Sequence, residues 1–425
     1  MAIDQIRQED EVRSITTPRK HTYVLPLVMV TTLFFMWGLA ISMLDVLNKH
    51  FQDVLQVSKG QSGLVQFAVY GAYFLMALPA GYFVRRFGYQ RGILLGLSLY
   101  AMGAFLFYPA AQVATFGFFL TALFVIGCGL AIIETAANPY VTVLGTPEGA
   151  VFRLNLAQSF NGLGVVLGPL IGGLVLFAAD NGSGLESVRL PYLLIGGVVL
   201  LLFVVFSLVK LPEIATESTT TEDETDAAAG QSKGLFQYRH FVYGLIAQFF
   251  YIGAQAGVWG FFINYAVDDV GDMTNQTASF YLSAAMVLYT AGRFMGTALL
   301  RYVSPVKLLT VYALVAALSM VLVMLNLGFI SLYALMLSCF CMSIMFPTIF
   351  ALGLKGLGKE TKKAGSYMIM SIVGGALIPP MMGLLADAVN TSSAFALPCL
   401  SFVIVFCFAK WGYKRTCKCE RELIG

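Results

Sequence analysis

Two carboxylic acids lie inside long apolar stretches of this sequence, where a charge is costly. Glu134 stands within residues 132–139, and Asp45 stands within residues 44–48. A charged side chain at the centre of a bilayer costs about 2.5–3.5 kcal/mol on insertion scales, and burial favours the neutral form of a carboxyl. A carboxyl that can be neutral near physiological pH is what a proton-coupling residue requires, so both acids are candidates for that role.

Each acid also has a simpler interpretation. Glu134 could be a neutral structural side chain that is hydrogen-bonded between helices. Asp45 lies close to the end of its apolar run, so it could be a helix-end group in water. Asn138 follows Glu134 by four residues and therefore lies on the same helical face, which favours a functional polar site around Glu134.

Amides and aromatic residues recur at helical spacing in two other apolar runs. In residues 241–267, four polar or aromatic side chains fall within one narrow arc at about 100° per residue. Amides offer both donors and acceptors, and aromatic rings suit the apolar faces of sugars. The alternative is hydrogen bonding between helices without a ligand. The candidate substrate-binding residues are Asn138, Gln158, Asn161, Gln248, Tyr251, Gln255 and Trp259.

Two arginines suit structural or gating roles. Arg293 lies near one end of an apolar run, from which its long side chain can reach the interface, and Arg153 lies at the edge of another run. The sequence places no cationic cluster at mid-membrane, which argues against an anionic substrate, and two isolated acids make no strong case for a metal. We find no nucleophile–base constellation, cofactor loop or nucleic-acid patch, so we expect no enzyme activity, cofactor or nucleic-acid partner.

The composition predicts that these residues lie in a lipid bilayer. Of the 425 residues, 58% are hydrophobic and only 12% are charged, whereas a soluble domain carries about 25% charged residues. Because a spanning helix needs about 20 mostly apolar residues, we expect an all-α polytopic membrane protein with twelve transmembrane helices. The predicted spans are residues 24–46, 62–84, 93–113, 115–140, 154–178, 191–209, 241–267, 278–300, 306–327, 332–354, 365–388 and 394–412.

The distribution of Lys and Arg predicts the orientation of these spans. Of the 26 basic residues, Lys49, Lys59 and Arg189 fall on the side opposite the termini, and Arg293 falls within a span. All the others lie on the side of the termini. Because basic residues are in excess in cytoplasmic loops, we expect both termini to be cytoplasmic. The first span follows a polar segment without a small-residue cleavage site, so we expect no cleavable signal.

The chain divides into two halves of six spans. Between them, residues 211–233 are rich in Glu, Asp, Thr and Ser without apolar periodicity, which is typical of a solvated linker. This is the layout of the major facilitator superfamily, in which two halves rock about a midplane site. The predicted organisation is a tail (1–23), a six-helix bundle (24–211), a linker (212–238), a second bundle (239–412) and a tail (413–425).

A more specific resemblance lies in the fourth and fifth spans. Residues 134–145 have the sequence ETAANPYVTVLG, and residues 152–161 have the sequence FRLNLAQSFN. Both stretches resemble the fucose–galactose–glucose:proton symporter family. The resemblance implies proton-coupled sugar uptake with one acid on the first span and one on the fourth, at the positions of Asp45 and Glu134. It also implies that the residues matching Gln158 and Asn161 line the sugar cavity.

The sequence departs from that family just before Asp45, and this leaves the sugar open. Residues 41–44 are Ile, Ser, Met and Leu, where the fucose transporters of the family have asparagines, so we expect a 6-deoxyhexose, a hexose or a related aldose. Residues 164–173 resemble a fifth-span motif of drug:proton antiporters, although small residues also serve close helix packing. We therefore expect a monomeric proton:sugar symporter of the bacterial inner membrane. The alternatives are a drug:proton antiporter and a non-transporting sugar sensor.

Overall fold

The computed structural model describes the chain as a helical protein. The described residues contain α-helices with short 3-10 and π segments, and no strand, which confirms the predicted all-α class. The predicted tails and most of the predicted linker lie outside the described residues. The described residues are 23–145, 150–177, 184–212, 235–271, 273–300, 302–355, 357 and 361–412.

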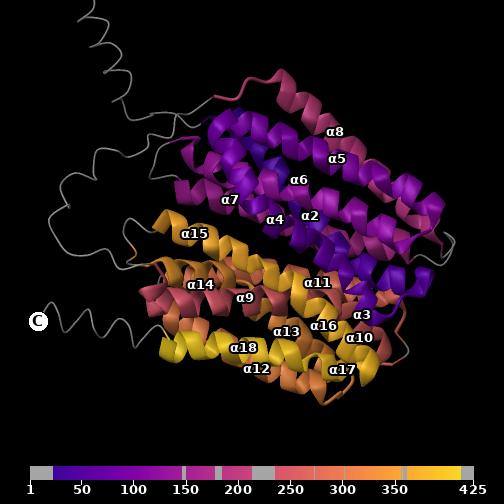
Figure 1. The fold of residues 1–425 in the computed structure, drawn as a ribbon. Coiled ribbons are helices and arrows are strands. Elements are labelled where there is room, and N and C mark those ends of the chain that lie inside the picture. The colour runs from indigo at the N-terminus through magenta and orange to yellow at the C-terminus, as the bar shows by residue number, and fades with distance from the viewer. Residues whose placement is uncertain are drawn as a thin grey trace, which may run out of the picture.

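The helices form two bundles that follow each other along the sequence and lie one against the other (Figure 1). The N-terminal bundle consists of α2 (Val24–Leu55), α3 (Lys59–Ser62), α4 (Leu64–Phe87), α5 (Tyr89–Val113), α6 (Phe116–Val143), α7 (Ala150–Ile171), η2 (Gly172–Leu176), η3 (Leu185–Val188) and α8 (Arg189–Leu208). The C-terminal bundle consists of η4 (Leu235–Gln237), α9 (Arg239–Gly260), α10 (Phe262–Asp268), α11 (Asn275–Leu299), α12 (Pro305–Met324), α13 (Phe329–Met342), α14 (Met345–Leu354), α15 (Thr361–Met370), η6 (Ser371–Val373), α16 (Gly374–Ala388), α17 (Thr391–Ala394), α18 (Ala396–Cys407) and η7 (Phe408–Gly412).

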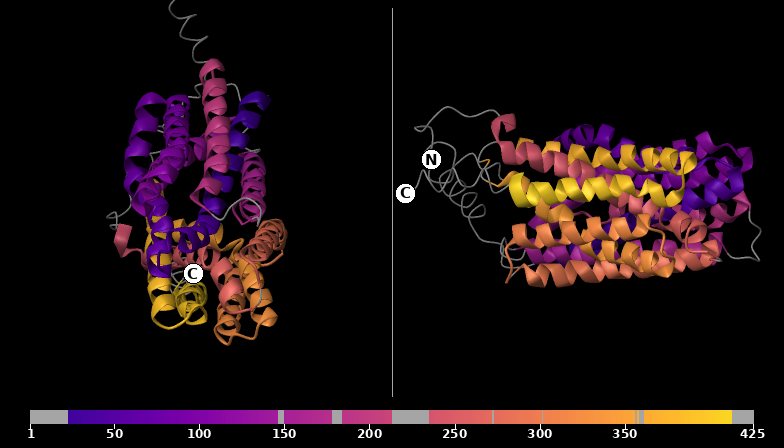
Figure 2. Two further views of the ribbon diagram at one scale, coloured as in Figure 1. Left: turned by 90° about the vertical axis from the view of Figure 1, so that its right-hand side faces the viewer. Right: turned by 90° about the horizontal axis from the view of Figure 1, so that it is seen from below.

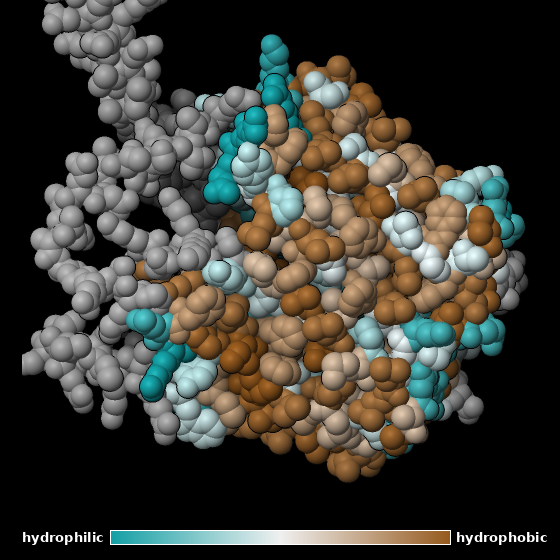
Figure 3. Space-filling model, viewed as in Figure 1, coloured by the Kyte–Doolittle hydropathy of each residue, from teal (hydrophilic) through white to brown (hydrophobic). Residues whose placement is uncertain are grey.

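Within the described ranges, eleven helical segments are long and apolar enough to cross a membrane. α11 is the twelfth helix of spanning length, with 25 residues, and it is more polar because it carries Asn275, Gln276 and Arg293. Figure 3 shows apolar side chains over the middle of the visible face and hydrophilic ones toward its two ends. An exposed apolar surface of this extent marks contact with lipid, as the twelve-helix prediction requires.

Several of the predicted spans are divided into shorter segments rather than forming one continuous helix. The span predicted at 241–267 is α9 followed by α10, with a break at Phe261, whose N–H is directed to the carbonyls of Gly257 and Trp259. Gly257 and Gly260 precede the break, and glycine is a poor helix former. The tenth span is similarly divided into α13 and α14, and the eleventh into α15, η6 and α16.

α2 is longer than the sequence predicts, and this corrects the position of Asp45. The predicted span ends at residue 46, whereas α2 continues to Leu55. The polar residues Asn48 and His50 are nevertheless only 0% and 2% exposed, because they form hydrogen bonds with neighbouring segments. At 1.5 Å per residue, Asp45 lies about 15 Å from the end of the helix. The interpretation of Asp45 as a helix-end group in water is therefore wrong.

The glycine-rich stretch 164–173 forms a helix-packing surface. α7 lies along α2, and a side-chain carbon added at Gly164 would overlap the Phe35 carbonyl oxygen of α2. A carbon added at Gly168 would overlap the Ser42 hydroxyl of the same helix. Glycines of this kind allow helices to approach closely. Packing therefore accounts for this stretch without an antiporter function.

Polar contacts connect the two halves at one end of the protein. The helices run lengthwise between two ends of the protein (Figure 2). The start of α2 and the last residue of η7 lie at one of them, which we call the terminal end. We call the opposite one the far end. At the far end, Lys59 Nζ of α3 lies 2.6 Å from Asp268 Oδ2 of α10. The backbone N–H groups of Lys59 and Gly60 donate to the Asp387 carboxylate of α16, at 3.0 and 2.7 Å. α3 thus connects the N-terminal half to two helices of the C-terminal half.

Candidate functional site

The first part of the candidate site surrounds Asp45 on α2. Asp45 is 4% exposed, and its Oδ2 atom has no hydrogen-bond partner among the described residues. Gln66 of α4 interacts with Asp45 and accepts a hydrogen bond at Oε1 from Asn48 Nδ2, at 3.1 Å. Its Nε2 atom is buried and lacks a partner within the described part of the chain. A buried acid and a buried amide donor therefore lie next to each other.

The second acid, Glu134 on α6, lies among aromatic side chains. Glu134 is partly buried and lies within hydrogen-bonding reach of the Tyr73 hydroxyl of α4. The same hydroxyl accepts a hydrogen bond from Trp37 Nε1 of α2, at 2.6 Å. Because a phenol can accept one hydrogen bond and donate another, Tyr73 can donate to Glu134 while it accepts from Trp37. Three helices are thereby connected at this acid.

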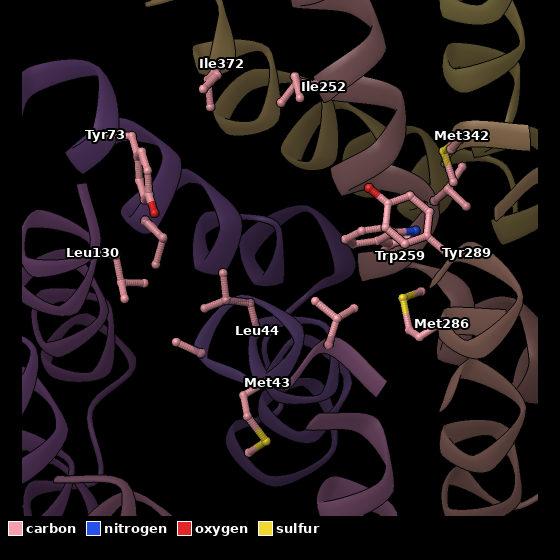
Figure 4. Close-up of a cluster of buried hydrophobic side chains, with 14 of the residues drawn as sticks. Met43, Leu44, Tyr73, Leu130, Ile252, Trp259, Met286, Tyr289, Met342 and Ile372 are labelled. Atoms are coloured by element: carbon pink, nitrogen blue, oxygen red, sulfur yellow. The ribbon is translucent and has the colours of Figure 1, made fainter. Parts of the chain in front are cut away.

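The C-terminal half contributes an aromatic and amide cluster. The rings of Trp259 on α9 and Tyr289 on α11 meet edge to face, with centroids 5.0 Å apart. Figure 4 shows this pair beside Met286, across the view from Tyr73 of the N-terminal half. Gln255 Nε2 donates to the Tyr289 hydroxyl at 3.1 Å. Ring surfaces beside amide and hydroxyl groups are the combination that binds the apolar face and the hydroxyls of a sugar.

Arg293 and Tyr70 both interact with Tyr289 of this cluster. Arg293 Nη2 donates to the Tyr289 hydroxyl at 2.7 Å, and Nη1 donates to Gln158 Oε1 of α7 at 3.4 Å. Tyr70 of α4 interacts electrostatically with Asp45, Glu134 and Tyr289. The predicted residues Gln158 and Arg293 are therefore brought together across the interface between the halves.

Six buried polar atoms of these residues and their neighbours have no hydrogen-bond partner within the described ranges. Buried polar groups in proteins are nearly always paired, so unpaired ones indicate where a ligand hydroxyl or a water molecule would bind. These atoms are Asp45 Oδ2, Gln66 Nε2, Asn138 Oδ1, Gln248 Oε1, Gln248 Nε2 and Trp259 Nε1.

Other predicted residues use their polar groups between helices in this state. The Tyr251 hydroxyl donates to the Met342 carbonyl at 2.8 Å, and Asn161 Nδ2 donates to the Phe34 carbonyl at 3.2 Å. Arg153 lies closer to the terminal end, where its Nε donates to a backbone carbonyl of α6 at 3.1 Å. A substrate role for Tyr251 and Asn161 and a gating role for Arg153 stay predictions.

The polar face of α4 is a part of the site that was not predicted from the sequence. Gln66, Tyr70 and Tyr73 are spaced i, i+4 and i+7, so they lie on one side of the helix, and all three interact with the acids. The spacing is visible in the sequence, but uncharged Gln and Tyr in an apolar run attract less attention than a carboxylate. Tyr289 was missed for the same reason, although it precedes Arg293 by one helical turn.

Two helical bundles with polar groups at their interface are the architecture of a secondary transporter. The comparisons with known proteins agree with this class. The sequence model of the Major Facilitator Superfamily matches residues 27–368 of this chain. The chain is 38% identical over 413 residues to the L-fucose-proton symporter of Escherichia coli, covering 92% of this chain and 94% of that protein. It is 37% identical over 407 residues to a glucose/galactose transporter of Brucella abortus, covering 94% and 96%.

Solved structures show the same relationship. The crystal structure of FucP, a Major Facilitator Superfamily transporter in the outward conformation, is 37% identical and superposes with a TM-score of 0.66, over 92% of this chain and 99% of that one. A D-xylose-proton symporter shares the fold at 13% identity, with a TM-score of 0.74, over 92% of this chain and 98% of that one. The chain therefore belongs to the Major Facilitator Superfamily, and the resemblance to the fucose–galactose–glucose:proton symporter family is confirmed.

Proposed function

We propose that this protein is a proton-coupled symporter that imports a small neutral sugar by alternating access. The observation that carries the proposal is the pairing of two acids in one half with an aromatic and amide cluster in the other half. The unpaired polar atoms at the same interface can bind hydroxyl groups. The names of the relatives, an L-fucose-proton symporter and glucose/galactose transporters, support the same substrate class.

We further propose that the terminal end is cytoplasmic and that the protein is a monomer of the bacterial inner membrane. The orientation is supported by the excess of Lys and Arg on the side of the termini. The far end then faces outward, and its contacts through Lys59 and Asp387 make the described state closed to the outside. Rocking of the halves would break these contacts and expose the site to the outside.

In this cycle, Asp45 and Glu134 carry the proton. A carboxylate is costly to move through a closed, lipid-embedded barrier, so protonation favours the passage of the loaded carrier. Arg293 connects the halves through Gln158 and is the residue best placed to sense sugar between them, while Arg153 is assigned to gating at the cytoplasmic end. The proposed sugar contacts are Asn138, Gln158, Asn161, Gln248, Tyr251, Gln255 and Trp259.

A drug:proton antiporter has less support. Its cavity should be mostly apolar, whereas Gln248, Gln255 and Gln158 place amides at the interface. The glycine-rich stretch that suggested an antiporter is explained by the contact of α7 with α2. The relatives reported above are named as sugar transporters.

The assignment of Glu134 is tested with reconstituted protein in vesicles. Glu134→Gln keeps the shape of the side chain but cannot bind and release a proton, so we expect it to lose proton-driven accumulation of sugar while it retains sugar exchange. The control is Glu186→Gln, because Glu186 pairs with Arg189 at 2.9 Å on the surface of one half. If Glu134→Gln vesicles still concentrate sugar against a gradient, the assignment is wrong.

A further inference from the structure

Gln66 is a buried amide that the proposed cycle does not yet use. It lies in the first turn of α4, at the far end, and it is 1% exposed. A buried amide normally has all its hydrogen-bonding groups satisfied. The Gln66 Nε2 atom instead lacks a partner among the described residues, and it lies beside Asp45.

The orientation of the Gln66 amide is fixed by Asn48. Asn48 Oδ1 accepts hydrogen bonds from Gln52 Nε2 at 2.8 Å and from Asn264 Nδ2 of the other half at 3.4 Å. Asn48 Nδ2 is therefore directed to the Ser62 carbonyl at 3.2 Å and to Gln66 Oε1 at 3.1 Å. Because Oε1 of Gln66 faces Asn48, its Nε2 must face the opposite direction.

The C-terminal half covers this pair at the junction of α9 and α10. A side-chain carbon added at Gly260, the last residue of α9, would lie 2.5 Å from Gln66 Nε2 and 3.8 Å from Asp45 Oδ1. Glycine at this position therefore lets the backbone of one half approach the amide and the acid of the other. Asn264, one turn further on, contacts Asn48 of the same network. Both contacts belong to the closed far end.

We propose that Gln66 is a positioning residue for the coupling proton, whose unpaired Nε2 donor is available to the Asp45 carboxylate while the junction of α9 and α10 covers both residues. The inference rests on the proposed role of Asp45. A donor N–H favours the carboxylate, whereas burial favours the neutral acid, so the Gln66 donor counteracts the effect of burial on Asp45 and eases proton release toward the interior. Opening of the far end removes Gly260 and Asn264 from the network and lets Asp45 take up a proton from outside.

Among the described residues, the titratable groups that interact with Asp45 are poorer donors to it than Gln66. The titratable groups that interact electrostatically with Asp45 from the helices around it are Tyr70 on α4 and Cys339 on α13. Cys339 carries a thiol, which is a weak donor. Tyr70 packs against Gly375 of α16 and reaches both acids only through longer-range electrostatics. Gln66 is therefore the amide whose loss should alter proton binding at Asp45.

The test is an infrared titration of the protonated-carboxyl band of the full-length protein in nanodiscs, combined with sugar counterflow in vesicles. In Gln66→Leu we expect the midpoint of the Asp45 band to move to higher pH by about one to two pH units, which corresponds to one charge-assisted hydrogen bond. Counterflow, which needs no net proton movement, reports separately on whether the variant still binds and moves sugar, so the midpoint of the band alone decides the role of Gln66. The control is Gln112→Leu, which removes an exposed amide of the same half and should leave the midpoint unchanged.

Asn48→Ala is the second variant, for the case that Gln66→Leu does not fold. It leaves Gln66 in place but removes the bond that orients its amide, so the midpoint should move in the same direction by a smaller amount. If the titrating band disappears in Asp45→Asn, the band belongs to Asp45. If its midpoint is then unchanged in both Gln66→Leu and Asn48→Ala, the role of Gln66 is wrong and the role of Asp45 stands. If Asp45→Asn changes neither the band nor the coupling of sugar transport to protons, the proposed role of Asp45 is wrong, and this inference is wrong with it.

Discussion

The contact between Asp387 and the start of α3 makes a quantitative prediction about the closed far end. The Asp387 carboxylate accepts two backbone N–H groups, from Lys59 at 3.0 Å and from Gly60 at 2.7 Å. These donors belong to the N-terminal half and the acceptor to the C-terminal half. Replacement by alanine removes both bonds while the neighbouring pair of Lys59 and Asp268 stays in place.

The size of the effect follows from the exposure of the contact. Hydrogen bonds to charged groups contribute about 1.5–3 kcal/mol when they are protected from water, but partly exposed charges are screened and contribute about 0.2–1 kcal/mol. Two bonds at this partly exposed place should therefore contribute about 0.4–2 kcal/mol. That free energy corresponds to a change of about 2- to 30-fold in the ratio of closed to open far ends.

The assay is a distance measurement between spin labels on the far-end residues Gln56 and Val389, which are exposed and belong to different halves. In a variant with the native cysteines replaced, Asp387→Ala should raise the ratio of long to short distances by the calculated factor. Glu186→Ala is the control, because its ion pair with Arg189 lies within one half. Identical distance distributions for wild type and Asp387→Ala would refute the reasoning.

Three further predictions concern binding, packing and pH. Trp259→Phe keeps a ring but removes the unpaired Nε1 donor, so the KM for sugar should rise about five- to tenfold, which corresponds to about 1–1.4 kcal/mol for one hydrogen bond; an unchanged KM would exclude this contact. Gly164→Val should lower Tm because its side chain would overlap the Phe35 carbonyl, whereas Gly197→Val, with open space around it, should not, and equal Tm values would contradict the packing argument. Burial raises the pKa of the Asp269 carboxyl, so the stability that this group contributes is lost as pH rises through its folded-state value. Asp269→Asn should therefore raise Tm at neutral pH, with a gain that disappears toward pH 3.8, the unshifted value; a gain that persists there would have another cause.

The fold could be predicted because lipid imposes simple rules on a sequence. Apolar runs of spanning length and the one-sided distribution of Lys and Arg define the number of helices without any knowledge of tertiary contacts. The same rules place the end of the first span at residue 46, because Asn48 and His50 look like residues outside the membrane. They are buried in α2 only because Ser62, Gln66 and Ser187 provide hydrogen bonds, and such partners cannot be identified from local composition.

The charged residues of the site could be predicted from the sequence. The uncharged ones could not, because their roles depend on which hydrogen-bond partners they meet in the fold. Asp45 and Glu134 stand out because carboxylates are costly in lipid. Gln66 and Tyr289 became candidates only when the structure showed which groups they face. Tyr251 and Gln255 share one face of α9, yet one donates to a backbone carbonyl and the other to Tyr289, a difference that periodicity cannot reveal.

The most direct test of the central claim is the measurement of external pH when sugar is added to de-energised vesicles that contain the wild-type protein. A panel of aldohexoses, 6-deoxyhexoses and pentoses covers the expected substrates. The proposed symport predicts that at least one of these sugars makes the external medium more alkaline as protons enter with it, and that Asp45→Asn and Glu134→Gln abolish the signal. Uptake of a sugar without any proton movement in the wild type would contradict the account.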